Sequence, residues 1–123
     1  MSDGGGRLLL LAPDLCPMRS LEGAGMYVGT LTCDLLLGDV RSLKQKRSAV
    51  RPLIADLRRA FDVSAAETGH LDLHRRAEVA VAVVAADPGH CHRVLSACEA
   101  LVAARPELEL LSVRSRVWDD EDE

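Results

Sequence analysis

Four basic side chains could bind an anion along one flank of a helix that the sequence predicts over residues 41–61. On a helical wheel of about 100° per residue, they gather on one side of this helix: Lys44, Arg47, Arg51 and Arg58. We call these four residues the basic flank. They span about 21 Å of helix, which is long enough to touch several phosphates through salt-sensitive contacts. The alternative is that they line a solvated helix face or pair with carboxylates of the following hairpin.

A second polar group surrounds a hairpin connection that we expect over residues 69–76. Its members are Glu67, Asp72, Arg76 and Glu78. Carboxylates beside an arginine could act as general acid and base, but we favour a structural network of arginine and carboxylates. The chain carries neither a glycine-rich phosphate loop nor a nucleophile elbow. We therefore assign no catalytic residue and favour a protein that is not an enzyme.

The histidines and cysteines do not have the spacing of metal ligands. His90 and His92 flank Cys91, but neighbouring residues of a helix point about 100° apart, and Cys91 falls on the core-facing side. His70 and His74 could converge only if the hairpin connection were helical. The chain has four cysteines: Cys16, Cys33, Cys91 and Cys98. Reduced, buried thiols fit this pattern, so we expect no metal, no cofactor and a cytoplasmic protein.

The composition of the 123 residues indicates one globular domain with a polarised charge. The formal net charge is −4, but residues 119–123 are all acidic, and residues 26–118 carry 13 basic against 11 acidic side chains. We expect an acidic tail over residues 119–123 and a disordered N-terminal extension over residues 1–25, which is rich in glycine. The apolar run at 8–12 is too short for a signal peptide or a membrane helix, so we expect no membrane partner.

The elements that would position these groups begin with a strand over residues 27–37, in which apolar and polar side chains alternate. Ser42 and Gln45 form a capping-box signature at the start of the basic helix. An apolar stripe should turn this helix toward a core: Leu43, Val50, Leu53, Ile54, Leu57 and Phe61. Pro52 lies opposite this stripe, where it can bend the helix without entering the core.

Two strands are predicted over residues 63–67 and 77–85. The second is so rich in small and β-branched residues that we expect a central strand buried on both faces. Asp87 and Pro88 mark the start of a second helix. A last strand follows over residues 107–118, with three apolar side chains on one face: Leu111, Val113 and Val117.

This order of elements predicts an α+β protein with the ferredoxin-like arrangement β-α-β-β-α-β, in which two helices cover one face of a four-stranded antiparallel sheet. The central strands would present small side chains without aromatic rings on the open face: Val28, Thr30, Thr32, Ala80, Ala82 and Val84. Recognition of RNA by base stacking is therefore not expected there. An exposed apolar face favours burial against a second copy, so we expect a homo-oligomer through the open sheet.

Four segments of the chain resemble the small bacterial YlxP-like proteins, which are also described as domain of unknown function 503. These segments are SLKQKR at 42–47, FDVSAAE at 61–67, LD at 71–72 and RAE at 76–78. The resemblance extends over residues 26–118 and implies a ferredoxin-like fold, without a settled activity. It also implies genes that often lie beside those for translation initiation factor two and ribosome-binding factor A. Pro52 and the acidic tail depart from the usual pattern of the family.

These features favour a non-enzymatic binding protein whose basic flank contacts structured RNA or the small ribosomal subunit. Two alternatives remain open. One is a small enzyme or ligand sensor that uses the hairpin carboxylates and Arg76. The other is a protein–protein interaction module whose basic helix contacts an acidic partner.

Overall fold

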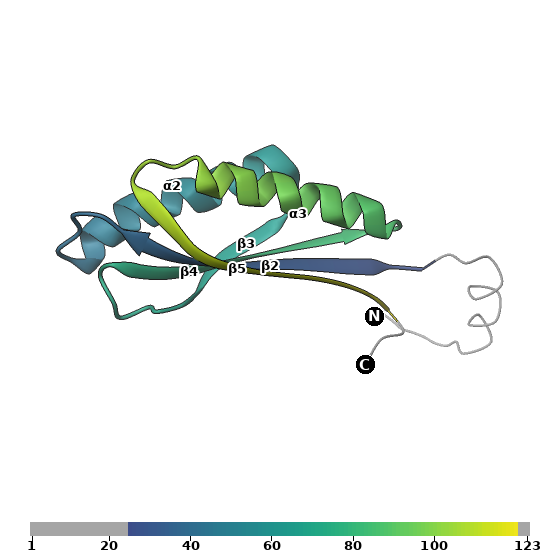
Figure 1. Ribbon diagram of the computed structural model, residues 1–123, viewed down its shortest axis with the longest axis horizontal. Coiled ribbons are helices and arrows are strands. Elements are labelled where there is room, and N and C mark those ends of the chain that lie inside the picture. Colours follow the sequence, from purple (N-terminus) through teal and green to yellow (C-terminus); the bar gives the residue numbers. More distant parts are fainter. Residues whose placement is uncertain (1–24, 121–123) are drawn as a thin grey trace, which may run out of the picture.

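The computed structural model describes residues 25–120, which form a four-stranded sheet covered on one face by two helices (Figure 1). The elements, in chain order, are β2 (Tyr27–Leu37), α2 (Leu43–Phe61), β3 (Ser64–Gly69), β4 (Arg76–Ala85), α3 (Pro88–Ala103) and β5 (Leu108–Asp119). The strands lie in the order β3-β4-β2-β5, and every neighbouring pair is antiparallel. The predicted α+β, ferredoxin-like fold is therefore confirmed.

The predictions for the N-terminal extension and the acidic tail lie almost entirely outside the described residues. At the C-terminal side, β5 continues through Asp119, which pairs with Tyr27 of β2. The first residue of the predicted tail is therefore part of the sheet.

Helix α2 begins where the capping-box signature predicted it. The Ser42 hydroxyl accepts a hydrogen bond from the Gln45 N–H at 3.1 Å, and the Gln45 side chain accepts one from the Arg41 N–H at 2.6 Å. The side chains that α2 buries lie at helical spacing: Lys46, Val50, Leu53 and Leu57. The prediction that Leu43 faces the core was wrong, because Lys46 takes the core-facing position of the first turn and Leu43 is 37% exposed.

Helix α3 begins at the predicted Asp87–Pro88 pair. Asp87 accepts a hydrogen bond from the Gly89 N–H at 3.1 Å, and Pro88 takes a position in the first turn, where its missing N–H leaves no bond unmade. The side chains that α3 buries lie on one stripe, with Cys91 among them as predicted: Cys91, Leu95, Cys98 and Val102. Neither helix of the region 25–120 has the length and apolar character needed to cross a membrane.

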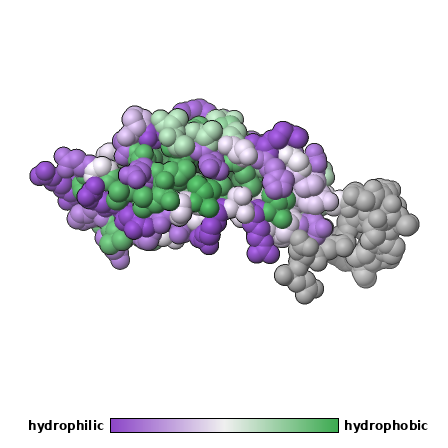
Figure 2. Space-filling model, viewed as in Figure 1, coloured by the Kyte–Doolittle hydropathy of each residue, from purple (hydrophilic) through white to green (hydrophobic). Residues whose placement is uncertain are grey.

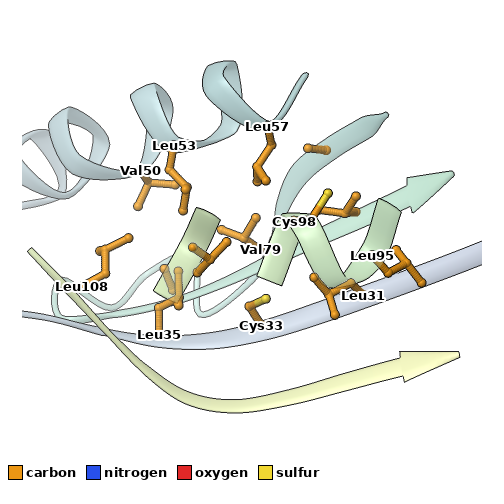
Figure 3. Packing of buried hydrophobic residues seen from close by; sticks show 14 of the residues in the cluster. Leu31, Cys33, Leu35, Val50, Leu53, Leu57, Val79, Leu95, Cys98 and Leu108 are labelled. Carbon is orange, nitrogen blue, oxygen red and sulfur yellow. The ribbon is translucent and has the colours of Figure 1, made fainter. Parts of the chain in front are cut away.

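The core lies between the helix layer and the sheet. Figure 3 shows Val50, Leu53 and Leu57 projecting from α2 toward the sheet, where Val79 and Cys33 lie. In the space-filling view, apolar residues gather along the middle of the molecule, and hydrophilic residues occupy its margins (Figure 2). Burial of these side chains on folding is the main force that holds the helices on the sheet.

The three described cysteines are buried free thiols, as expected: Cys33, Cys91 and Cys98. Burial raises the pKa of each thiol, and that of Cys33 rises to about 11. These thiols therefore stay protonated at neutral pH, and they contribute packing rather than reactivity.

Strand β4 is central, as predicted, but it is buried on one face only. Ala77, Val79 and Val81 face the core and are buried, whereas the alternate side chains are partly exposed and Val84 is 62% exposed. The prediction of burial on both faces was wrong because both helices lie on the same side of the sheet (Figure 1).

A bulge interrupts the predicted apolar face of β5. Between Asp34 and Leu35 of β2, the pairing with β5 shifts and leaves Leu111 as an extra residue. Leu111 is 42% exposed, whereas Val113 and Val117 pack against the core as predicted. The prediction failed for Leu111 because alternation along a strand assumes an unbroken register.

Strand β2 passes close beneath α3 at Gly29. A Cβ placed on this residue would lie 3.0 Å from the Leu95 side chain, 3.1 Å from that of Cys91 and 3.2 Å from that of Val83. These distances are shorter than ordinary contacts between side chains, so only glycine fits without movement of its neighbours.

We predict that Gly29→Ala lowers the free energy of unfolding by about 1–3 kcal/mol, because the added methyl group overpacks the space between β2 and α3. Gly38→Ala is the matched control, since a Cβ at Gly38 meets nothing within 4 Å. Urea unfolding of both variants measures the difference. Equal midpoints for the two variants would contradict the tight packing at Gly29.

Candidate functional site

The basic flank lies on the side of α2 that faces the edge strand β3. Arg58 shows this orientation directly, because its Nη2 donates a hydrogen bond to the Ala65 carbonyl oxygen of β3 at 2.6 Å. Arg51 and Arg58 line a groove between α2 and β3, with Ile54 at its apolar side. Arg58 therefore braces the helix against the sheet and is the least available member of the flank for a ligand.

The other three members of the basic flank are exposed and unpaired. Within residues 25–120, no carboxylate lies at ion-pair distance from Lys44, Arg47 or Arg51. Together with Ser48 and Pro52, they line an open groove of about 490 Å³ on the outer surface of α2. Their spacing of three and four residues extends over about 10 Å of helix. Three cations in this arrangement can contact more than one phosphate of the same partner.

The basic residues on the other side of α2 are used by the fold. Arg59 pairs with Asp56 of the same helix, and Arg105, which follows α3, pairs with the same carboxylate. Asp56 therefore ties α2 to the end of α3. The unpaired positive charge of α2 is left on its β3 side.

The predicted polar network around the hairpin is divided between the two faces of the sheet. Glu67 lies on the helix-facing side of β3, where its Oε2 is 2.7 Å from Lys46 Nζ. Arg76 and Glu78 lie on the open side of β4, and Asp72 is exposed in the turn that joins β3 to β4. Glu67 and Arg76 therefore face opposite sides of the sheet, and this arrangement does not favour an enzyme or sensor that uses both.

Lys46 is the buried residue at the centre of the polar contacts on the helix-facing side of the sheet. Its side chain is 3% exposed, and its Nζ pairs with Glu67 and donates a hydrogen bond to the His70 carbonyl oxygen at 2.7 Å. Lys46 was not predicted as a contact residue, because it lies within a run of basic residues. The signal that could have identified it is its spacing from Val50 and Leu53, which places it on the buried stripe.

The open side carries a second ion pair, between β2 and β4. Arg76 Nη2 donates a hydrogen bond to Asp34 Oδ2 at 2.5 Å, and His70 Nε2 lies 3.3 Å from Asp34 Oδ1. The hydrogen bond from Arg76 lowers the pKa of Asp34 below its usual range and raises that of Arg76. Beside this pair, Glu78 accepts a hydrogen bond from the Thr68 hydroxyl at 2.8 Å. Asp34 was missed because 42 residues separate it from Arg76.

His70 connects the two halves of the divided network. Its backbone has a φ of 57°, the left-handed conformation that few residues other than glycine adopt. This turn directs its carbonyl oxygen to Lys46 on the helix-facing side, whereas its ring lies against Asp34 and Arg76 on the open side. The hairpin turn is therefore held from both faces of the sheet.

The residues considered as metal ligands do not converge. Cys91 lies on the buried side of α3, whereas His90 and His92 of the same helix are exposed. In the part of the chain that the structure describes, no three histidine, cysteine, aspartate or glutamate side chains are grouped so that they could hold a metal ion.

Comparison with known proteins agrees with the resemblance found in the sequence. The family described as "Protein of unknown function (DUF503)" matches residues 28–115. "Uncharacterized protein YlxP" from Bacillus subtilis (strain 168) is 26% identical over 88 residues, which are 72% of this chain and 96% of that protein. The crystal structure of an amidase of the hydantoinase/carbamoylase family from Burkholderia phymatum is similar over 80% of this chain, with a TM-score of 0.50 and 16% identity. The chain spans only 29% of that amidase, so the likeness shows a shared fold alone.

We predict that Lys46→Met lowers the free energy of unfolding by about 1–3 kcal/mol, because the Glu67 carboxylate and the His70 carbonyl lose their buried donor. Lys44→Met, which removes an exposed ammonium from the same turn, should cost less than about 0.5 kcal/mol. Replacing both partners in Lys46→Met/Glu67→Met should recover part of the loss. Urea unfolding provides the comparison, and equal stability of the two single variants would contradict a structural ion pair.

We predict that Asp34→Asn lowers stability at neutral pH and that its difference from the wild type shrinks in acid. The pKa of Asp34 is lowered by folding, so its stabilising contribution is present above the unfolded pKa of about 3.9 and is lost as the pH falls through the lower folded pKa. Unfolding curves across this range test the prediction. The control is Asp72→Asn in the exposed turn, and a difference between wild type and Asp34→Asn that does not change with pH would contradict it.

Proposed function

Because this chain belongs to the DUF503 family of proteins of unknown function, we propose its function from its surface chemistry: it is a non-enzymatic protein that binds structured RNA through the basic flank of α2. The observation that carries the proposal is the set of three exposed and unpaired cations along one side of one helix: Lys44, Arg47 and Arg51. Phosphates can pair with these three cations, none of which has a carboxylate of residues 25–120 at ion-pair distance.

The shape of the flank supports RNA more than a small anion. The groove around Pro52 is open, and Lys44 and Arg51 lie at its two ends about 10 Å apart along the helix, so they can contact separate phosphates. Two or more phosphates of a folded RNA backbone match this spacing. Such contacts position an RNA on the protein without specifying its sequence.

The small ribosomal subunit is the source of structured RNA that we propose as the partner. An acidic protein is the competing partner for the same flank. Nuclease treatment separates the two, because binding to RNA is lost when the RNA is cut, whereas binding to a protein surface survives.

We predict that Arg47→Glu/Arg51→Glu weakens binding to a labelled hairpin of small-subunit ribosomal RNA at least tenfold at low salt. The slope of log affinity against log salt should fall by about two, since each phosphate contact contributes about 0.9. Fluorescence anisotropy across a salt series measures both quantities. Thermal unfolding should change little, because both side chains are exposed and unpaired.

The matched control is a pair of single variants that carry the same change of charge. Arg51→Glu alters the flank, whereas Arg93→Glu alters an exposed arginine on α3. Arg51→Glu should weaken binding more than Arg93→Glu. Equal losses of affinity in Arg51→Glu and Arg93→Glu would show that binding depends only on the total charge of the protein. An unchanged affinity of Arg47→Glu/Arg51→Glu would show that α2 is not part of the binding site.

A further inference from the structure

The open face of the sheet carries a second basic surface, on strand β5. Arg114, Arg116 and Trp118 pair with Thr32, Thr30 and Val28 of β2, respectively. Directly paired residues of antiparallel strands point to the same face, and these three positions of β2 alternate with buried core residues. All three β5 side chains therefore lie on the face that the helices leave open. We call them the β5 row.

The β5 row combines unpaired positive charge with a stacking surface. The Arg116 guanidinium lies over the Trp118 ring, 4.7 Å from its centroid. Arg114 and Arg116 are exposed, and within the described part of the chain neither has a carboxylate at ion-pair distance. Trp118 is the single tryptophan of the chain. Its ring was not expected on this face, because the prediction considered the two central strands alone.

Small side chains line the part of the open sheet face beside the β5 row, which we call the floor. An open groove of about 380 Å³ crosses the sheet face, lined by Thr30, Thr32, Ser64, Ala65, Ala66, Thr68, Ala80, Val81 and Ala82. Small side chains let a planar group approach the sheet closely. The hydroxyls among them can accept or donate hydrogen bonds to the edges of unpaired bases.

The charges on this face favour a phosphate-bearing partner over a second copy of the chain. Burying Arg114 and Arg116 against another protein requires carboxylates to pair with them. Two carboxylates of this face, Asp34 and Glu78, are already bonded to Arg76 and Thr68. Phosphates supply the missing negative charge without competing with these bonds.

We propose that the β5 row and the adjoining floor bind single-stranded RNA. One base adds to the stack of Arg116 on Trp118, Arg114 and Arg116 hold phosphates, and the threonine hydroxyls face the next base. This inference rests on the proposed RNA-binding function and extends it to an unpaired segment of the RNA. The basic flank lies beside β3 and the β5 row lies on the opposite edge strand, so the two surfaces can be tested separately.

The test is a titration of the full-length chain with short oligouridylate at low salt, followed by tryptophan fluorescence. Since Trp118 is the single tryptophan, the signal reports this site alone. We expect saturable quenching in the wild type and in Arg47→Glu/Arg51→Glu. Arg114→Glu/Arg116→Glu should lose at least tenfold in affinity. In an anisotropy assay with labelled oligouridylate, Trp118→Ala should lose about tenfold and Trp118→Phe should lose less.

Two results would overturn the inference. The first is the absence of any change in Trp118 fluorescence while the RNA hairpin still binds through the basic flank, in which case the proposed function stands and this extension fails. The second is a Trp118 emission that shifts with protein concentration in the absence of RNA, together with a dimer in sedimentation equilibrium, because a second copy then covers the face. The opposite result is also informative. If Arg47→Glu/Arg51→Glu leaves hairpin binding unchanged while Arg114→Glu/Arg116→Glu weakens oligouridylate binding, the proposal for the basic flank is contradicted and the proposal for the β5 row is supported.

Discussion

The pairing of the buried Lys46 ammonium with its partners is the interaction on which the position of the basic flank depends. It replaces an apolar side chain in the first turn of α2, so it must find partners, and it finds them in the Glu67 carboxylate and the His70 carbonyl oxygen. These contacts anchor the first turn of α2 to the β3–β4 hairpin and, together with the buried apolar stripe, fix the rotation of the helix about its axis. Because that rotation turns Lys46 and Leu53 inward, the basic flank is turned outward over the β3 edge.

The distribution of paired and unpaired charge separates the residues that build the fold from those that are free for a partner. Asp56 holds Arg59 and Arg105, and Asp34 holds Arg76, so these arginines are engaged within the protein. The flank and the β5 row have no such carboxylates in the described part of the chain. Exposed charge of this kind contributes little to stability. Its concentration on two surfaces is the observation from which we propose an anionic partner.

The two-layer architecture explains why one chain can present two such surfaces. Both helices lie on one side of the sheet, so no helix or strand of residues 25–120 covers the opposite side (Figure 1). Arg114 and Arg116 lie on that side, which leaves it less apolar than the central strands alone had indicated. A homo-oligomer through this face remains a prediction, and the arginines of β5 are the reason that we favour RNA there.

Much of this protein could be predicted from the sequence, because the signals are local. Ser42 and Gln45 cap α2, Asp87 and Pro88 start α3, and alternation marks β2, so the element order and the ferredoxin-like fold followed. The exposed members of the basic flank were also predictable, since helical spacing alone places them on one side. The tertiary structure decided what depends on long-range pairing. It brought Asp34 to Arg76, buried Lys46, and shifted the register beside Leu111, because a residue's partner across a sheet is set by strand register, to which no local pattern in the sequence corresponds.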